Sequence, residues 1–87
     1  MIRFYQPKSF RKQYNKLPLK IKNKFLGRWK IFMVNPYDSI LHNHPLTGGY
    51  EGFRSINVTG DYRAIYVMDG DVAVFIAIGT HSELFGK

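Results

Sequence analysis

The sequence contains no cysteine, and no acidic residue precedes Asp38. Without cysteine the chain has neither a disulfide framework nor a thiolate zinc site, which is typical of a protein in a reducing compartment. No apolar run approaches the roughly 20 residues needed to span a bilayer, and the N-terminal residues lack the apolar core of a secretion signal. We therefore expect a soluble cytoplasmic protein with no membrane partner.

The absence of acids leaves a strongly basic N-terminal third. The chain has 87 residues and a net charge of +7, and ten of its 13 Lys and Arg residues lie within residues 1–30. Such a field concentrates polyanions and speeds their association with the protein. The charge favours an anionic partner, either nucleic acid or an acidic protein. The alternative is a pair of lysine-rich helix faces that serve only solubility.

The apolar residues of the first half have the spacing of two helices. Phe10, Tyr14 and Leu17 recur at i, i+4 and i+7, and the apolar residues of 19–35 continue this period after a proline. We expect a helical hairpin with an aromatic inner face. Trp29 belongs to that face, so we interpret it as a core residue rather than a base-stacking one.

The second half has the pattern of a β-meander. The predicted strands are residues 2–6, 52–58, 62–68 and 72–78. Two-residue turns, Thr59-Gly60 and Asp69-Gly70, separate the last three strands. The whole chain, residues 1–87, is predicted as a single α+β domain of order β-α-α-β-β-β, with the helical hairpin on one face of a small, antiparallel-rich sheet. The last strand should be central, because VAVFIAI is apolar throughout.

The open face of the sheet is the expected place for chemistry. Residues of alternating number share a face, so Arg54 and Arg63 project to the same side if the hairpin register brings their faces together. Two arginines on one shallow surface would bind an anion such as a phosphate. Alternatively, each is an exposed strand residue paired with Glu51 or Asp61.

Three histidines, His42, His44 and His81, are candidate general acids and bases. A metal site that combines them with Asp61 is disfavoured, because no recognised zinc spacing is present and the surroundings are cationic. Beside arginines, imidazole suits phosphate chemistry, in which guanidinium binds the phosphate and imidazole moves protons. In RNA the 2′-hydroxyl is a built-in nucleophile, so cleavage needs no metal and we expect no cofactor.

Structural roles remain open for two of these residues. Asp61 is a common turn residue. His81 can be a helix-entry residue whose neighbours Thr80 and Ser82 cap a terminal turn.

The segments HPLTGGYEGFRSINVTGDYRAIYVM and IGTHSELFG resemble the YafQ branch of the RelE/ParE toxin superfamily. The resemblance covers residues 44–86, whereas the first half is similar only in its helical-hairpin organisation. It implies a RelE-like fold and the toxin of a bacterial type II toxin–antitoxin pair. Such toxins are small endoribonucleases that cut mRNA, usually in the ribosomal A site, and an acidic antitoxin wraps over them.

The resemblance also implies roles for individual residues. His44, Asp61, His81 and Phe85 match functional positions of the YafQ branch, and Arg63 matches a functional arginine of the RelE branch. The implied reaction is attack by a 2′-hydroxyl on its own phosphate, which gives a 2′,3′-cyclic phosphate and a 5′-hydroxyl. His81 is then the general acid, and Asp61 or His44 is the base.

Further residues are expected to bind RNA. Arg54 stands where the RelE branch has a lysine, and Tyr62 replaces a tryptophan of the YafQ site. Lys20 and Lys24 belong to the basic helices and are expected to contribute to the same surface.

Two departures from the YafQ pattern leave other functions open. Asn57 replaces a histidine and Ala77 replaces an arginine. We hypothesise that Arg63 supplies the charge that is missing at position 77. One alternative function is a catalytically degenerate toxin that keeps antitoxin binding. Another is a ParE-like inhibitor of DNA gyrase on the same fold.

Overall fold

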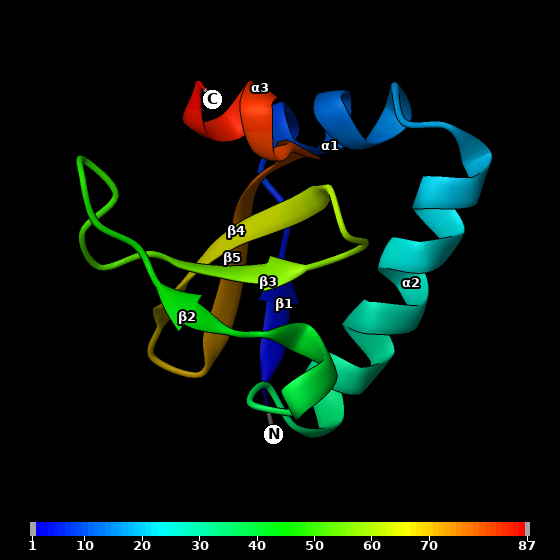
Figure 1. Cartoon of the computed structure of the whole chain (residues 1–87). Coiled ribbons are helices and arrows are strands. Elements are labelled where there is room, and N and C mark those ends of the chain that lie inside the picture. The colour runs from blue at the N-terminus through cyan, green and yellow to red at the C-terminus, as the bar shows by residue number, and fades with distance from the viewer. Residues whose placement is uncertain (1, 87) are drawn as a thin grey trace.

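The computed structural model describes residues 2–86. Its elements are β1 (Arg3–Tyr5), α1 (Lys8–Asn15), α2 (Leu19–Val34), the 3-10 helix η1 (Ser39–Leu41), β2 (His44–Pro45), β3 (Arg54–Asn57), β4 (Tyr62–Asp69), β5 (Val72–Thr80) and α3 (His81–Phe85). The strands form one sheet in the order β1-β5-β4-β3-β2 (Figure 1). β1 pairs with β5 in parallel, and the other pairs are antiparallel. The predicted α+β fold with an N-terminal helical hairpin is confirmed.

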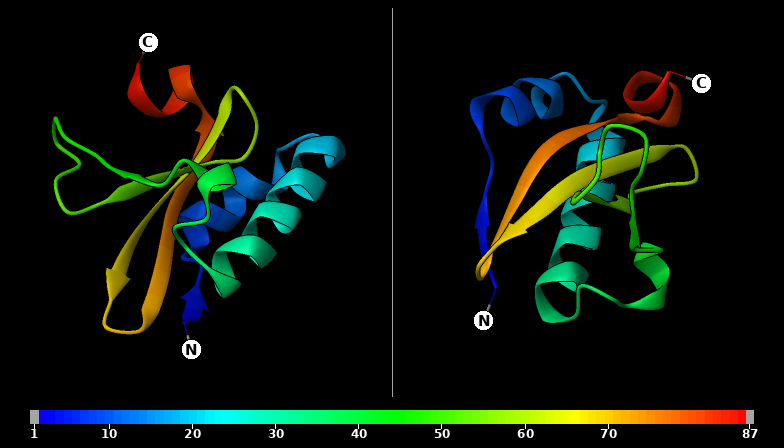
Figure 2. Two further views of the ribbon diagram at one scale, coloured as in Figure 1. Left: turned by 60° about the horizontal axis from the view of Figure 1, so that its bottom comes forward. Right: turned by 90° about the vertical axis from the view of Figure 1, so that its left-hand side faces the viewer.

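The helical hairpin covers one face of the sheet (Figure 2, left), and aromatic side chains fill the space between them. Phe10, Phe25 and Phe32 are at most 1% exposed, and their ring centroids lie 6.1, 5.9 and 5.2 Å from that of Phe75 in β5. Trp29 packs against this cluster, as predicted. Each fully buried aromatic side chain contributes about 1.5–3 kcal/mol of transfer free energy, so this face provides most of the stability.

β5 is central, as its apolar sequence predicts, but it is longer than expected. The strand continues through Gly79 to Thr80, whereas the sequence predicted that it ends at residue 78, before the glycine. A Cβ at Gly79 would lie 2.8 Å from Oε1 of Glu83, which accepts a hydrogen bond from the backbone N–H of Thr80 at 2.8 Å. The glycine therefore permits a close approach between β5 and α3 rather than a break in the strand.

The segment before the meander, residues 37–51, lacks clear periodicity but contains two short elements. Leu41 of η1 is fully buried, which anchors this segment to the core. β2 has only two residues, and it pairs with β3 through His44 opposite Ser55 and Pro45 opposite Arg54. A two-residue strand has no detectable alternation, so sequence periodicity does not reveal it. The loop after β2 projects on the side opposite α1 and α2 (Figure 2, left).

Within residues 2–86, the longest helix is α2, and it is too short and too polar to cross a bilayer.

Candidate active site

The register between β3 and β4 separates the two arginines that were expected on one surface. Asn57 pairs with Arg63, and Arg54 pairs with Tyr66, whose ring packs against Phe32 of α2. Arg54 therefore shares the helix-covered face, and Arg63 projects from the outer face. The prediction of a joint anion site formed by these two residues is wrong.

The physical reason is the length of the connecting turn. A two-residue turn at Thr59-Gly60 would bring both arginines to the same face. In the structure the backbone N–H of Val58 donates to the carbonyl of Tyr62 at 2.9 Å, so three residues, Thr59 to Asp61, lie between the paired positions. A shift of one residue in register moves every side chain of a strand to the other face.

A cavity of about 270 Å³ lies on the outer face, between β2, the start of the following loop, β3, β4 and α3. Its lining residues are His44, Pro45, Leu46, Thr47, Ser55, Arg63, His81 and Phe85. Four residues that the sequence marks as functional thus meet here from three separate elements, β2, β4 and α3: His44, Arg63, His81 and Phe85. No acidic side chain lines this cavity, so Arg63 gives it a positive charge.

The ring of His44 is held in one orientation by the backbone. Its Nδ1 lies 2.8 Å from the carbonyl oxygen of His42. A carbonyl only accepts hydrogen bonds, so Nδ1 carries the proton, and in the neutral ring Nε2 is left with a free electron pair. His42 has a left-handed backbone with φ of 48°, the one non-glycine residue of this kind among residues 2–86. This conformation directs its carbonyl towards His44.

His81 is the first residue of α3, and its position is fixed by a capping box. The side chain of Thr80 accepts from the N–H of Glu83, and the Glu83 carboxylate accepts from the N–H of Thr80. The N–H of His81 donates to the carbonyl of Asp61 at 2.9 Å, which connects α3 to the start of β4. The Phe85 ring lies 4.9 Å from the imidazole. His81 is therefore both a helix-entry residue and a residue of the cavity.

Arg63 is fixed through one end of its guanidinium group. Its Nη1 donates to the carbonyls of Thr59 and Gly60 at 3.0 Å and to that of Tyr62 at 3.2 Å. The other guanidinium nitrogens, Nε and Nη2, form no hydrogen bond with residues 2–86. The turn thus orients the arginine and leaves part of its donor fork for an anion.

Asp61 lies next to this site but does not line the cavity. Its side chain is exposed, and it reaches His81 through its backbone carbonyl. The sequence prediction of a carboxylate base at this position receives no geometric support from the cavity lining.

Arg54 has a different environment from Arg63. Its Nε donates to Oδ1 of Asn43 at 2.7 Å, and its guanidinium carbon lies 5.4 Å from the ring centroid of Tyr37. Asn43 in turn donates to the Tyr66 hydroxyl at 2.6 Å. Burial raises the pKa of the Tyr66 phenol above its ordinary value, and this effect outweighs the opposing hydrogen bond from Asn43. Arg54 therefore connects the segment that carries His44 to the sheet.

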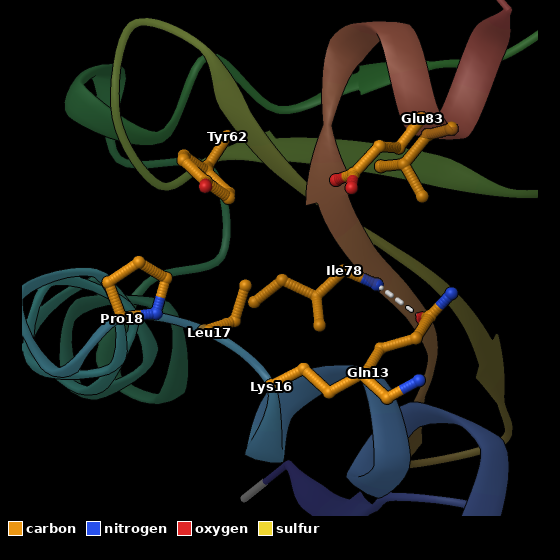
Figure 3. Close-up of a pocket in the computed structure, with 8 residues that line it drawn as sticks. Gln13, Lys16, Leu17, Pro18, Tyr62, Ile78 and Glu83 are labelled. Carbon is orange, nitrogen blue, oxygen red and sulfur yellow. Dashed lines mark hydrogen bonds between the residues drawn. The ribbon is translucent and has the colours of Figure 1, made fainter.

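Tyr62 lies in a second cavity, of about 300 Å³, on the side of the helices. Figure 3 shows its ring near Pro18 and Leu17, with Glu83 of α3 on the other side of the space. Gln13 lines the same cavity and accepts a hydrogen bond from the backbone N–H of Ile78 at 3.0 Å. Tyr62 was expected to bind RNA, but it is separated from the cavity that contains the histidines.

Sequence reasoning missed Ser55 as a cavity residue. Ser55 is fully buried, and its hydroxyl has no hydrogen-bond partner among residues 2–86. A serine between arginine and isoleucine gives no recognisable signal, and only the pairing with His44 reveals its position. Lys20 and Lys24 are exposed on α2 and do not line this cavity.

The third histidine, His42, also lies outside the cavity lining and faces a neighbouring hollow. Among residues 2–86, no three histidine, aspartate or glutamate side chains come together as metal ligands.

Similar folds occur among small bacterial toxins. The crystal structure of YafQ from Escherichia coli BL21(DE3) has a TM-score of 0.83 at 24% identity, over 99% of this chain and 100% of that one. A chain of the E. coli DinJ–YafQ toxin–antitoxin complex has a TM-score of 0.76 at 26% identity, over 98% of both chains.

Sequence similarity then identifies the family. The profile of the YafQ family, bacterial toxins of type II toxin–antitoxin systems, matches residues 3–86. The mRNA interferase toxin YafQ of E. coli K12 is 34% identical over 65 residues, which are 75% of this chain and 71% of that protein. The chain belongs to the YafQ family of type II toxins, and the resemblance found in its sequence is confirmed.

Proposed function

We propose that the protein is an mRNA interferase, an endoribonuclease that cuts translated message in the cytoplasm, with the ribosomal A site as the place of cleavage. The observation that carries this proposal is the cavity in which His44, His81 and Arg63 meet on the outer face of the sheet. Two imidazoles and a guanidinium are sufficient for metal-independent cleavage of RNA, because the substrate supplies its own nucleophile. The similar E. coli protein is named an mRNA interferase.

His44 is the proposed general base. The hydrogen bond from its Nδ1 to the carbonyl of His42 supports this role, because Nε2 is the free nitrogen that can accept a proton. It would take the proton of the ribose 2′-hydroxyl as the 2′-oxygen attacks the adjacent phosphorus. Asp61 was the alternative base, but its side chain does not line the cavity.

His81 is the proposed general acid. It would donate a proton to the 5′-oxygen as the bond from that oxygen to phosphorus breaks. The products are a 2′,3′-cyclic phosphate and a 5′-hydroxyl, so atoms and charge balance without water or metal. Phe85, whose ring lies 4.9 Å from the imidazole, would hold the acid in position and offer a face on which a base can stack.

Arg63 is the proposed phosphate ligand. Its free Nε and Nη2 would stabilise the charge that grows on the phosphate oxygens in the transition state. The same residue can replace the arginine that the YafQ pattern has at position 77. Ala77 pairs with Ile65, and Ile65 lies two residues from Arg63 on the same strand, so both positions face the outer side. Full activity of Arg63→Ala would overturn this assignment.

The protein partner that we infer is an acidic antitoxin. The net charge of +7 and the exposed Lys20 and Lys24 of α2 are complementary to such a partner, and a similar toxin is known in complex with DinJ. The same lysines can contact RNA when the antitoxin is absent.

The test is primer-extension mapping of a reporter message after induced expression of the native protein and of His81→Ala. We expect discrete cuts within translated regions that disappear in the variant, and fragments that end in a 2′,3′-cyclic phosphate. Fragments with a 5′-phosphate would exclude the proposed chemistry. Intact message with arrested growth would instead indicate a non-nuclease inhibitor of the gyrase type, and intact message without arrest would indicate a binding module.

A further inference from the structure

A third cavity, of about 260 Å³, lies between α2, the end of η1, and the turn that joins β3 to β4. Its lining residues are Arg28, Ile40, His42, Asn57, Val58, Thr59 and Gly60. No acidic side chain lines it, and the proposed reaction uses none of its side chains. In Figure 1 this turn extends from the sheet towards α2.

Arg28 is the group that makes this cavity unusual. Its Nε is buried, and the structure gives the side chain no hydrogen bond or ion pair with residues 2–86. Leaving a buried charged donor without a partner is unfavourable, and guanidinium binds phosphate oxygens through two parallel hydrogen bonds. His42 and Asn57 also line the cavity, and an imidazole and a side-chain amide can both donate hydrogen bonds to an anion.

The cavity lies next to the candidate active site, although the two share no lining residue. Asn57 lines this cavity and Ser55 lines the other, and two residues along one strand face are about 6–7 Å apart. The carbonyl of His42 holds the ring of His44. The carbonyls of Thr59 and Gly60 hold Arg63. A strand of RNA that leaves one cavity would therefore enter the other.

The basic surface of α2 leads to this cavity. Lys20, Lys24 and Arg28 are spaced at i, i+4 and i+8, so they lie along one face of the helix. The two lysines are exposed, and Arg28 is half-buried at the cavity. The three cations form a positive track that ends at this cavity.

We propose that this cavity is a second phosphate subsite, which binds the RNA backbone next to the scissile phosphate. Arg28 is the principal ligand, and His42 and Asn57 complete the site. This inference rests on the proposed nuclease function, because RNA is its ligand. An acidic segment of a protein is the competing ligand, and continuity with the catalytic cavity favours RNA.

The test compares Arg28→Gln and Arg28→Lys with the native protein. Lys30→Gln is the matched control, because Lys30 is an exposed cation of α2 that lies two residues further on, on a different face, and does not line this cavity. We expect Arg28→Gln to raise the KM for message on programmed ribosomes by about tenfold, since hydrogen bonds to charged groups are worth at least this much, and to leave kcat within about twofold. The KM of Arg28→Lys should lie between that of the native protein and that of Arg28→Gln. The KM of Lys30→Gln should equal the native value.

A binding measurement separates this proposal from the nuclease assignment. The probe is a 2′-O-methyl RNA hexanucleotide of mixed sequence, which lacks the nucleophile and is not cleaved. The slope of log affinity against log salt concentration should fall by about 0.7 in Arg28→Gln, the value for one lost phosphate contact on a single strand, and remain unchanged in Lys30→Gln. Thermal unfolding of each variant verifies that the fold is intact.

Each outcome decides a different point. Weaker binding by Arg28→Gln without any cleavage by the native protein would support the subsite and reject the nuclease. Cleavage by the native protein with equal KM and equal salt slope in Arg28→Gln would support the nuclease and reject the subsite. If Arg28→Gln and Lys30→Gln change KM and the salt slope equally, the change reflects only the loss of net positive charge. This result would also reject the subsite. If Arg28→Gln weakens binding of a polyglutamate peptide but not of RNA, the cavity serves a protein partner instead.

Discussion

The two faces of the sheet contain residues from the same strands but have opposite properties. On the helix-covered face of β3 and β4, Ile56, Ala64 and Tyr66 are at most 1% exposed and belong to the core. On the outer face the intervening positions include the polar residues Asn57 and Arg63, beside the fully buried Ser55 and Ile65. Alternation along a strand thus assigns stability to one face and chemistry to the other, and the rigid face fixes the geometry of the open one.

The two arginines of these strands show the difference most directly. Arg54 is engaged by Asn43 and Tyr37, whereas Arg63 keeps two guanidinium nitrogens available. Arg54 therefore serves structure, by holding the segment with His44, and Arg63 serves the proposed reaction. Substitutions on the two faces should separate activity from stability.

The largest expected effect is on activity and comes from the outer face. His44→Ala removes the proposed general base, so the rate of message cleavage should fall by about 10²–10⁴-fold. The side chain is exposed, so the free energy of unfolding should change by less than about 0.5 kcal/mol. Single-turnover cleavage and urea unfolding measure the two quantities. A fall of less than tenfold in the cleavage rate would show that another group acts as the general base.

On the helix-covered face, the largest expected effect of a substitution is a loss of stability. Phe75→Ala removes the ring that Phe10, Phe25 and Phe32 surround, which should lower the free energy of unfolding by about 3–5 kcal/mol. The total free energy of unfolding of such a domain is only about 5–15 kcal/mol, so much of the variant should be unfolded at 37 °C. Activity per folded molecule, measured at low temperature with the folded fraction from circular dichroism, should remain close to native. A catalytic defect in the folded fraction would show that the two faces are not independent.

The arginine pair offers a smaller and sharper comparison. Arg54→Gln leaves the side chain of Asn43 without its charged partner, so it should cost about 1–3 kcal/mol of stability. Arg63→Gln should cost less stability, because Nη1 contacts only turn carbonyls, and should lower kcat by about 10²–10³-fold. Thermal unfolding measures the stability of both variants, and single-turnover kinetics measures their cleavage rates. If Arg54→Gln gave the larger loss of kcat at full stability, the sequence-based assignment of Arg54 to the RNA would be restored.

The sequence predicts much of the fold because hydrophobic periodicity reflects burial directly. The spacing of Phe10, Tyr14 and Leu17 and the run VAVFIAI determine which helices and strands form and where the core lies. The faces of Arg54 and Arg63 could not be predicted in the same way. They depend on whether the turn after Val58 contains two or three residues, and both lengths fit the local residues.

The candidate site was predictable only in part, through the resemblance to known toxins. That resemblance marks His44, Arg63, His81 and Phe85, which line one cavity in the structure, and also Asp61, which does not line it. It does not reveal Ser55 or the cavity of Arg28, because these depend on strand pairing and on the distance between α2 and a turn. Such long-range distances arise from packing of the whole chain, and no local pattern encodes them.

The smallest expected effect concerns the helix-covered face and the dependence of stability on pH. Burial raises the pKa of Tyr66 in the folded protein, so the unfolded chain loses this proton at a lower pH than the folded one. Stability from this group is fully present below about pH 10, the ordinary value of tyrosine, and is lost as the pH rises through the folded-state pKa. Tyr66→Phe removes the titrating group, and Asn43 keeps its bond to the Pro36 carbonyl.

The variant should be less stable than the native protein by about 0.5–1.5 kcal/mol at pH 7, because it lacks one hydrogen bond. Above pH 10 this gap should narrow, because the native protein loses the contribution of Tyr66 and the variant has none to lose. Urea unfolding at pH 7, 9.5, 10.5 and 11.5 measures the gap, and the other tyrosines are common to both proteins and cancel. A gap that stayed constant up to pH 11.5 would show that the phenol of Tyr66 ionises as readily in the folded core as in the unfolded chain, and the helix-covered face would then be less dry than its packing indicates.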